Sequence, residues 1–134
     1  MVGGGTDEQH FSPLSDINEQ NVAELKPAWY ADYDTMRGQE GEPLVIDGVM
    51  YVSTAWSKIY AYDAETGKQL WFYDPKVPGA AGVRGCCDVV NRGVAHEKGR
   101  IFIGTFDGRL VAVDAKTGKE LWAVNTVDQT RNFT

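Results

Sequence analysis

The two cysteines of the chain are neighbours, Cys86 and Cys87. A trans pair has its Cα atoms about 3.8 Å apart, whereas ordinary disulfides span about 4.4–6.8 Å. Adjacent sulfurs can therefore bond only in a strained ring, and that ring would restrain very little of the chain. Such a bond could instead act as a small, rigid, apolar plate against which a flat molecule lies. Two reduced thiols side by side in a loop are the alternative, and the spacing alone leaves both open.

The composition limits the classes of protein to which these cysteines can belong. The chain has 134 residues, in the range of one domain, and a net charge of −6 without any long basic run. This balance argues against a nucleic-acid surface. No apolar stretch approaches the length of a membrane span. Residues 1–5 lack the apolar region of a signal peptide, so we expect a cytosolic chain or one that starts after its targeting sequence.

An internal repeat of 51 residues is the second informative feature. Residues 48–71 and 99–122 align without a gap, and 10 of their 24 positions are identical. The identical pairs include the last residues of the two segments, Trp71 and Trp122. This degree of identity indicates two copies of one structural unit.

Each copy contains three runs rich in β-branched and aromatic residues, which predict strands. Asp-Gly at 107–108 is a hairpin signal between two of them. The shared Asp-Ala-x-Thr-Gly-Lys segment predicts a turn, in which the Asp caps backbone amides and the Gly supplies a positive φ. The predicted strands are 50–54, 59–62 and 70–73, followed by 101–105, 110–113 and 121–124.

Other segments break this pattern. A short helix is expected at 21–26, with Asn21 as the N-cap and Glu24 in the capping-box position. Residues 28–31 are predicted to form the last strand of an earlier, partial blade. Long connections at 32–43 and 74–92 interrupt the strands, and long loops in compact folds usually serve function. The cysteine pair lies in the second of these loops.

Repeated units of this kind are typical of an all-β protein, a β-propeller with W-shaped, four-stranded blades. The repeat units cover about 44–73 and 95–124, which is two to three blades with the partial one. Blades must bury their faces against neighbours, and open ends leave apolar surface and strand edges exposed. We therefore expect residues 1–134 to be the N-terminal part of a larger propeller, an incomplete domain.

The sequence resembles the quinoprotein alcohol dehydrogenases, which use pyrroloquinoline quinone (PQQ), over essentially the whole chain. The resemblance is carried by the cysteine pair, by the tryptophan-bearing blade repeats and by the N-terminal run from Phe11 to Leu25. Residues 29–30, 37–40 and 79–87 look more like the ethanol and quinohaemoprotein branch than like methanol dehydrogenase. The combination is specific, whereas the blade motif alone also occurs in non-catalytic propellers.

This resemblance implies an eight-bladed propeller with PQQ on its axis beside a Ca²⁺ ion. In the family, a vicinal disulfide covers one face of the quinone, and Cys86 and Cys87 match it. Arg92 matches an arginine that pairs with a PQQ carboxylate. The planar guanidinium of arginine suits this contact, because two of its N–H groups can bind both carboxylate oxygens. Glu40 matches a glutamate at the polar edge of the cofactor. Without the family, Arg92 would be an ordinary loop arginine and Glu40 one of several solvated acids.

The remaining aromatic and histidine residues are expected to be structural or peripheral. Trp71 and Trp122 are predicted to dock between blades and to hydrogen-bond through the indole N–H. Trp56 lies in a turn and could be either structural or functional, so it is left out of the site. His10 and His96 have no carboxylate or thiol at ligand spacing and are expected on the surface.

The resemblance also implies parts that this chain does not supply. The Ca²⁺ ligands, the catalytic aspartate, a tryptophan on the other quinone face and a threonine contact come from later blades, and the chain ends near that threonine segment, at 131–134. No Cys-x-x-Cys-His is present, so haem c, if any, would lie in a further domain. The implied reaction oxidises primary alcohols to aldehydes in the periplasm and passes electrons to a cytochrome. The 134-residue chain alone is expected to be inactive.

Two rival interpretations compete with this one. One is a non-enzymatic propeller scaffold or interaction module, such as the outer-membrane assembly lipoproteins built from similar blades. Nothing in such a scaffold requires adjacent cysteines followed by Asp-Val-Val-Asn-Arg. The other is a remnant of a degenerate gene, which a reading frame that continues into further blades would exclude.

Overall fold

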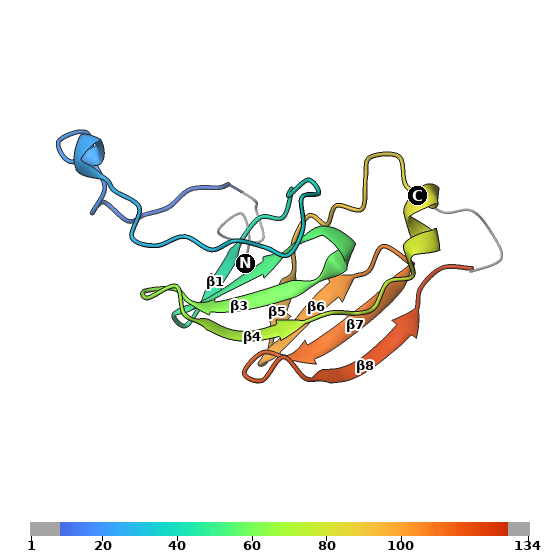
Figure 1. The fold of residues 1–134 in the computed structure, drawn as a ribbon. Coiled ribbons are helices and arrows are strands. Elements are labelled where there is room, and N and C mark those ends of the chain that lie inside the picture. The colour runs from blue at the N-terminus through green and yellow to red at the C-terminus, as the bar shows by residue number, and fades with distance from the viewer. Residues whose placement is uncertain (1–8, 129–134) are drawn as a thin grey trace.

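A computed structural model describes residues 9–128 of the chain. Eight strands form two four-stranded antiparallel sheets, each in sequential order (Figure 1). The first sheet, blade 1, contains β1 (Leu44–Ile46), β2 (Val49–Ser53), β3 (Ile59–Asp63) and β4 (Gln69–Tyr73). The second, blade 2, contains β5 (Ala95–Glu97), β6 (Arg100–Gly104), β7 (Arg109–Asp114) and β8 (Glu120–Asn125). The predicted all-β blade architecture is confirmed, and the six strands predicted within the two repeats start and end within one residue of the observed bounds of β2, β3, β4, β6, β7 and β8.

The sequence repeat corresponds to a repeat of backbone geometry. The pairing of the last two strands shifts register between Ala61 and Tyr62 in blade 1, and at the matching Ala112 and Val113 in blade 2. A shift of this kind marks a β-bulge, which increases the local twist. The two blades therefore share their irregularities as well as their strands.

The turn between the third and fourth strand of each blade is built as the sequence predicts. The Thr66 amide donates to the Asp63 carboxylate at 2.8 Å, and the Thr117 amide donates to Asp114 at the same distance. Gly67, the glycine of the first turn, has a φ of +72°. The aspartate side chains thus replace backbone acceptors in a tight turn.

Three short 3₁₀ helices complete the described secondary structure: η1 (Val22–Glu24), η2 (Ala55–Ser57) and η3 (Gly79–Arg84). The predicted helix at 21–26 is therefore shorter than expected, and its capping box does not form. The Asn21 carboxamide instead accepts from the Asn18 amide at 2.9 Å, one turn earlier. None of the helices among residues 9–128 is long and apolar enough to cross a membrane.

The prediction of a strand at 28–31 is wrong. A strand requires a neighbour for its ladder of hydrogen bonds, and this segment pairs with no strand of the described chain. Trp29 nevertheless contacts blade 1, because its indole N–H donates to the Ala64 carbonyl at 3.0 Å. The tryptophan contact is thus present without the strand that was expected to carry it.

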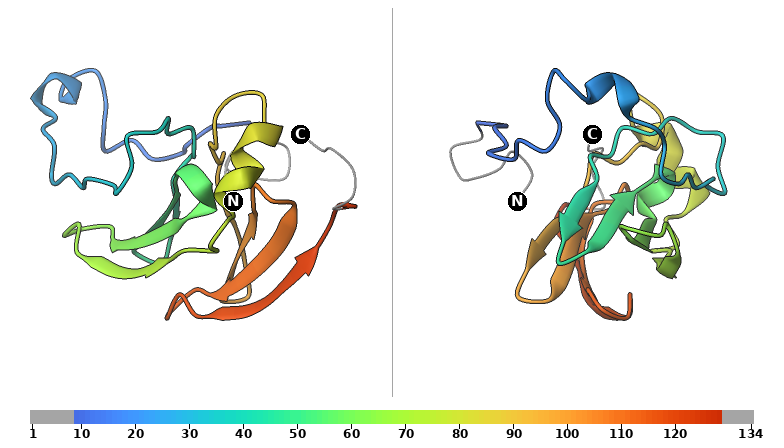
Figure 2. Two further views of the ribbon diagram at one scale, coloured as in Figure 1. Left: turned by 45° about the vertical axis from the view of Figure 1, so that its right-hand side comes forward. Right: turned by 90° about the vertical axis from the view of Figure 1, so that its left-hand side faces the viewer.

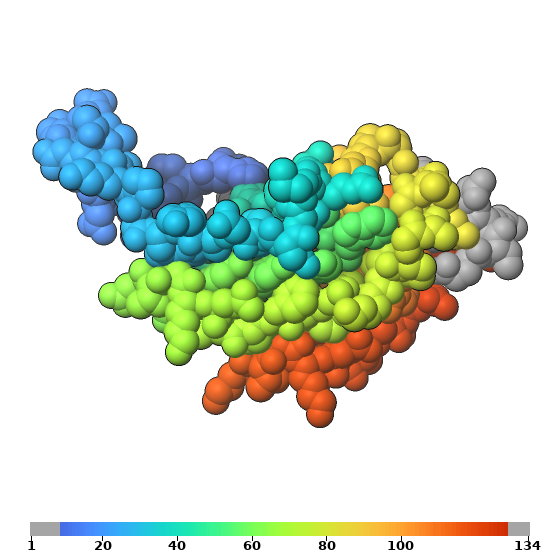
Figure 3. Space-filling model, viewed as in Figure 1, coloured from blue at the N-terminus to red at the C-terminus, as the bar shows by residue number. Residues whose placement is uncertain are grey.

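The two blades pack face to face around one hydrophobic core, with their sheets at an angle to each other (Figure 2). Ile59, Ala61 and Trp71 contribute to this core from blade 1, and Ile101 and Val111 contribute from blade 2. The residues that lead into β1 lie along blade 1, whereas the first part of the described chain, drawn in blue, extends as an arm away from the sheets (Figure 3). It carries exposed Phe11, Leu14 and Ile17, so its apolar side chains are not buried by the two blades.

Candidate functional site

Cys86 and Cys87 form a disulfide in the segment between η3 and β5, with Cα atoms 3.8 Å apart. This resolves the alternative of two reduced thiols in favour of the plate. Gly85 precedes the pair, and a Cβ atom at this position would overlap the Phe106 ring. The Phe106 ring of blade 2 packs directly against the backbone that leads into the disulfide, so a larger residue at position 85 would have to displace the ring.

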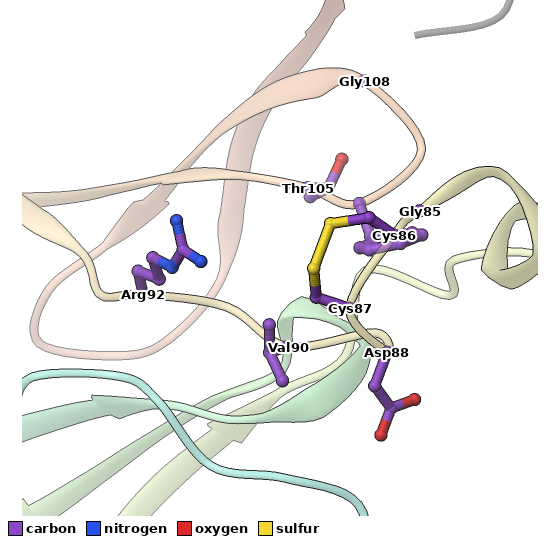
Figure 4. Close-up of a pocket in the computed structure, with 9 residues that line it drawn as sticks. Gly85, Cys86, Cys87, Asp88, Val90, Arg92, Thr105 and Gly108 are labelled. Carbon is purple, nitrogen blue, oxygen red and sulfur yellow. A yellow bond between two sulfur atoms is a disulfide. The ribbon is translucent and has the colours of Figure 1, made fainter. Parts of the chain in front are cut away.

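The disulfide lines a cavity of about 260 Å³ on the side of the molecule where both long loops lie. Figure 4 shows the disulfide on one side of this pocket and Arg92 on the other, with Thr105 and Val90 between them. Most of the lining is apolar, and it comes from two segments, 85–92 before β5 and 105–108 between β6 and β7. The lining residues are Gly85, Cys86, Cys87, Asp88, Val90, Arg92, Thr105, Phe106 and Gly108.

Arg92 and Glu40, both proposed from the sequence, lie together at the pocket. The Arg92 Nε donates to a Glu40 carboxylate oxygen at 3.2 Å, and the Arg92 side chain is 79% exposed. Within the described chain, the two terminal nitrogens of Arg92 make no hydrogen bond. The carboxylate therefore orients the guanidinium and leaves its outer donors available for an anionic group.

A second ion pair joins the same two loops, but here the first loop supplies the arginine and the second loop supplies the carboxylate. Arg37, from the loop that carries Glu40, contacts Asp88 at 2.6 Å between Nη1 and Oδ1. The Val89 amide and the Arg37 guanidinium hold the pKa of the Asp88 carboxyl below its usual value. The residue directly after the disulfide is therefore a carboxylate with two stabilising partners.

Buried Ser57 connects the pocket segments of the two blades. Its hydroxyl oxygen accepts from the Phe106 amide at 2.9 Å and from the Asn91 carboxamide at 3.4 Å. The Asn91 carboxamide also donates to the Gly104 carbonyl at 2.9 Å. Because Asn91 precedes Arg92, these bonds fix the direction in which the chain leaves the disulfide and delivers the arginine to the pocket.

The structure thus brings together all four residues proposed from the sequence: Cys86, Cys87 and Arg92 line the cavity, and Glu40 contacts Arg92. Sequence reasoning missed Thr105, Phe106 and Gly108, which follow β6. Their position in the turn next to the predicted hairpin was visible, but nothing in the sequence placed that turn beside the cysteines. Arg37 was also missed, and Trp56, which had been left unassigned, lies behind the disulfide segment.

The histidines stay outside this site. His96 lies on β5 and lines a different cavity, at the opposite end of the strands. Among residues 9–128, no group of three or more His, Cys, Asp or Glu side chains could hold a metal ion. The expected end of the chain near a threonine segment, at 131–134, lies outside the described residues.

The donor set of the pocket suits a flat, anionic cofactor. The disulfide and the Phe106 ring offer an apolar wall, and Arg92 offers unengaged N–H donors at the rim. A planar aromatic molecule with carboxylates needs both properties, apolar contact for its face and charged hydrogen bonds for its edge. PQQ is such a molecule, so the residues present fit it.

The chain is similar to known proteins over most of its length. A family model described as glucose/ethanol/alcohol dehydrogenase, β-propeller domain, with the short name PQQ, matches residues 1–127. The dehydrogenase subunit of alcohol dehydrogenase (quinone) from Komagataeibacter europaeus is 63% identical over 120 residues, which cover 90% of this chain and 16% of that protein.

Solved structures give the same relationship. Quinohemoprotein alcohol dehydrogenase from Comamonas testosteroni superposes with a TM-score of 0.90 at 49% identity, covering 93% of this chain and 19% of that one. A europium-containing methanol dehydrogenase superposes with a TM-score of 0.89 at 40% identity, covering 96% of this chain and 23% of that one. The chain therefore spans between about a sixth and a quarter of the length of these relatives.

Proposed function

Because the chain belongs to the PQQ family of glucose, ethanol and alcohol dehydrogenase β-propellers, we propose that it forms part of the cofactor site of a PQQ-dependent alcohol dehydrogenase. The observation that carries this proposal is the shared pocket, in which the Cys86–Cys87 disulfide and Arg92 face one cavity. The non-enzymatic scaffold is not favoured, because the matched family and the similar proteins named above are dehydrogenases.

Each proposed site residue has a distinct task. The disulfide of Cys86 and Cys87 provides a rigid apolar surface for one face of the quinone and excludes water from it. Arg92 directs its two free terminal nitrogens toward a carboxylate of the cofactor, a charge-assisted contact. Glu40 holds the Arg92 Nε and contributes to the polar edge of the site.

Bound PQQ would supply the acceptor for the electrons that leave the alcohol carbon, chemistry that no side chain provides. The residues of this chain bind and orient that group, and none of them is proposed to act as the catalytic base. We assign the base and the Ca²⁺ ligands to further blades. The similarity to a europium-containing methanol dehydrogenase supports a metal beside the cofactor.

The parent protein is proposed to oxidise primary alcohols to aldehydes and to pass the electrons to a cytochrome. The quinohemoprotein relative supports a haem as the next electron carrier, in a domain or a partner. We propose a periplasmic location, where a disulfide persists. The remaining blades of the propeller are the expected partners of residues 1–134, since the relatives are several times longer.

The cofactor assignment is tested by equilibrium dialysis of PQQ against the oxidised chain. We expect saturable binding that is lost in the Cys86→Ser/Cys87→Ser double variant. Arg92→Met should weaken binding about tenfold or more, because a hydrogen bond to a charged group contributes about 1.5–3 kcal/mol. Arg100→Met, which removes the same charge from an exposed position on β6, is the matched control. Equal affinity of all four proteins would overturn the assignment.

The division of labour between blades is tested by turnover. The 134-residue chain, supplied with PQQ and Ca²⁺, is expected not to oxidise ethanol when dye reduction is followed. Turnover above that of free PQQ would contradict the assignment of the base and the metal ligands to other blades.

A further inference from the structure

Three non-glycine residues with left-handed backbone conformation gather behind the disulfide. The φ angles are +64° at Trp56, +57° at Ser57 and +69° at Asp88. Such conformations are unfavourable for residues with a Cβ atom and persist only where the surrounding contacts enforce them. They also concentrate at functional sites, which directs attention to the contacts that hold these three residues in place.

Arg37 contacts two of the three residues with one side chain. Its Nη1 lies 2.6 Å from the Asp88 carboxylate, and its guanidinium carbon lies 5.9 Å from the centroid of the Trp56 ring. A guanidinium can do both at once, because its edge donates hydrogen bonds while its face lies on an aromatic ring. Arg37 therefore connects the residue after Cys87 to the turn between β2 and β3.

Trp56 contacts the disulfide segment on both sides of the cysteines. Its backbone N–H donates to the Val89 carbonyl at 2.9 Å, after the pair. Before the pair, a Cβ atom at Gly82 would lie 3.1 Å from the Trp56 ring. The tryptophan thus supports the segment from behind, and Arg37 joins this support to Asp88.

Arg37 is not among the residues that line the pocket. Figure 4 shows the Asp88 carboxylate, its partner, pointing away from the pocket. Arg37 therefore does not line the pocket itself, and its contacts reach the disulfide segment through Asp88 and Trp56.

We propose that Arg37 is a positioning residue for the disulfide platform, acting through its ion pair with Asp88 and its contact with Trp56. The inference rests on the proposed function for its purpose, since the platform is assigned to PQQ. Its physical content is independent of PQQ: the contact restrains Asp88, and through it the backbone on which the two sulfurs are mounted. Without Arg37, the segment gains freedom and the open dithiol form becomes less unfavourable.

The first measurement is the ratio of reduced to oxidised dithiothreitol at which half of the disulfide is reduced, determined by alkylation and mass spectrometry. We expect Arg37→Met to lower this ratio several-fold. Asp88→Asn should do the same, because asparagine tolerates the left-handed conformation and only the charge is lost. The control Arg100→Met should match the wild type.

The double variant Arg37→Met/Asp88→Asn separates a shared contact from two independent effects. Its ratio should equal that of Arg37→Met, since Asp88→Asn removes an ion pair that Arg37→Met has already removed. A wild-type ratio in folded Arg37→Met, or a fully additive double variant, would overturn the proposal. If circular dichroism shows that Arg37→Met does not fold, Asp88→Asn alone decides by the same criterion.

The second measurement is PQQ affinity by equilibrium dialysis. In Arg37→Met, affinity should fall several-fold although every pocket-lining side chain is retained. Unchanged affinity together with a shifted reduction ratio would refute the link to the cofactor. If the wild-type chain itself binds no PQQ, the proposed function fails, while the reduction ratios still decide whether Arg37 holds the platform.

Discussion

Arg92 shows how one side chain can serve both the protein and a ligand. Its Nε is engaged by Glu40, while its terminal nitrogens make no hydrogen bond among residues 9–128 and 79% of the side chain is exposed. A loop arginine without such an anchor loses conformational entropy when it binds an anion. The Glu40 contact reduces that loss in advance, so the pair is better suited to binding than either residue alone.

Tyr60 and Tyr62 carry phenols whose ionisation is opposed by the folded structure. Burial, and for Tyr60 also a hydrogen bond of 2.9 Å to the Asp34 carboxylate, raises the pKa of each phenol from 10.0 to about 12. The neutral phenol is thus favoured in the folded state. Its contribution to stability is complete below pH 10, the unfolded pKa, and is lost as the pH rises toward 12.

We therefore predict that the free energy of unfolding falls between pH 10 and pH 12, as measured by urea denaturation. Tyr60→Phe should show a shallower fall, because one of the phenols with a raised pKa is absent. Tyr30→Phe, at an 86% exposed position, should retain the wild-type slope. A Tyr60→Phe slope equal to that of the wild type would show that this phenol does not carry the effect.

At the level of elements, the turn after the third strand is also the docking point for the neighbouring segment. The Trp71 indole donates to the Ala115 carbonyl at 3.0 Å, as Trp29 does to Ala64. A Cβ atom at Gly118 would lie 2.5 Å from the Trp71 ring, and one at Gly67 would lie equally close to Trp29. The turn glycine therefore provides both a positive φ and the flat backbone on which the indole lies.

Gly118 and Gly99 separate these two roles. Both have positive φ, +69° and +73°, but only Gly118 faces a ring. Gly99→Ala should destabilise by about 1–2 kcal/mol through backbone strain alone. Gly118→Ala should lose a further 1–3 kcal/mol, approximately, because the methyl group overlaps the indole. Urea denaturation of both variants tests this, and equal losses would exclude the packing role.

At the level of the whole molecule, the two blades differ in what covers them. Trp71 is buried in the core between blades, whereas Trp122 at the matching position is 37% exposed, and its indole makes no hydrogen bond with residues 9–128. Leu121 and Val124 are exposed beside it. Blade 2 thus presents the surface that blade 1 buries, which is the surface expected at the end of an incomplete stack of blades.

Alanine substitutions of the two tryptophans should reveal this asymmetry in the 134-residue chain. Trp71→Ala should destabilise by about 3–5 kcal/mol, as expected for a buried tryptophan. Trp122→Ala should have a much smaller effect, since part of its surface is already in water. Chemical denaturation measures both, and similar losses would indicate that Trp122 is covered in solution.

How far the sequence predicted the structure depends on the range of the interactions. Strand positions, the aspartate turns and the role of Trp71 were predictable, because side-chain alternation and turn chemistry act within a few residues. Each of these sequence patterns occurs twice, once in each copy of the repeat, which strengthened the prediction. The strand at 28–31 was wrongly predicted, because its composition is that of a strand but no neighbouring strand is present among residues 9–128 to pair with it.

The spacing of the cysteine pair singled it out but left a disulfide and two thiols both open, and its role at the cofactor, like those of Arg92 and Glu40, came from the family resemblance. Only the tertiary structure could show that the disulfide is closed, that Phe106 packs beside it and that Arg37 supports it through Asp88. Arg37 and Asp88 lie 51 residues apart in loops without periodicity. Local patterns determine which elements form, whereas the packing of one blade on the next determines which loops meet, and the pocket is made where they meet.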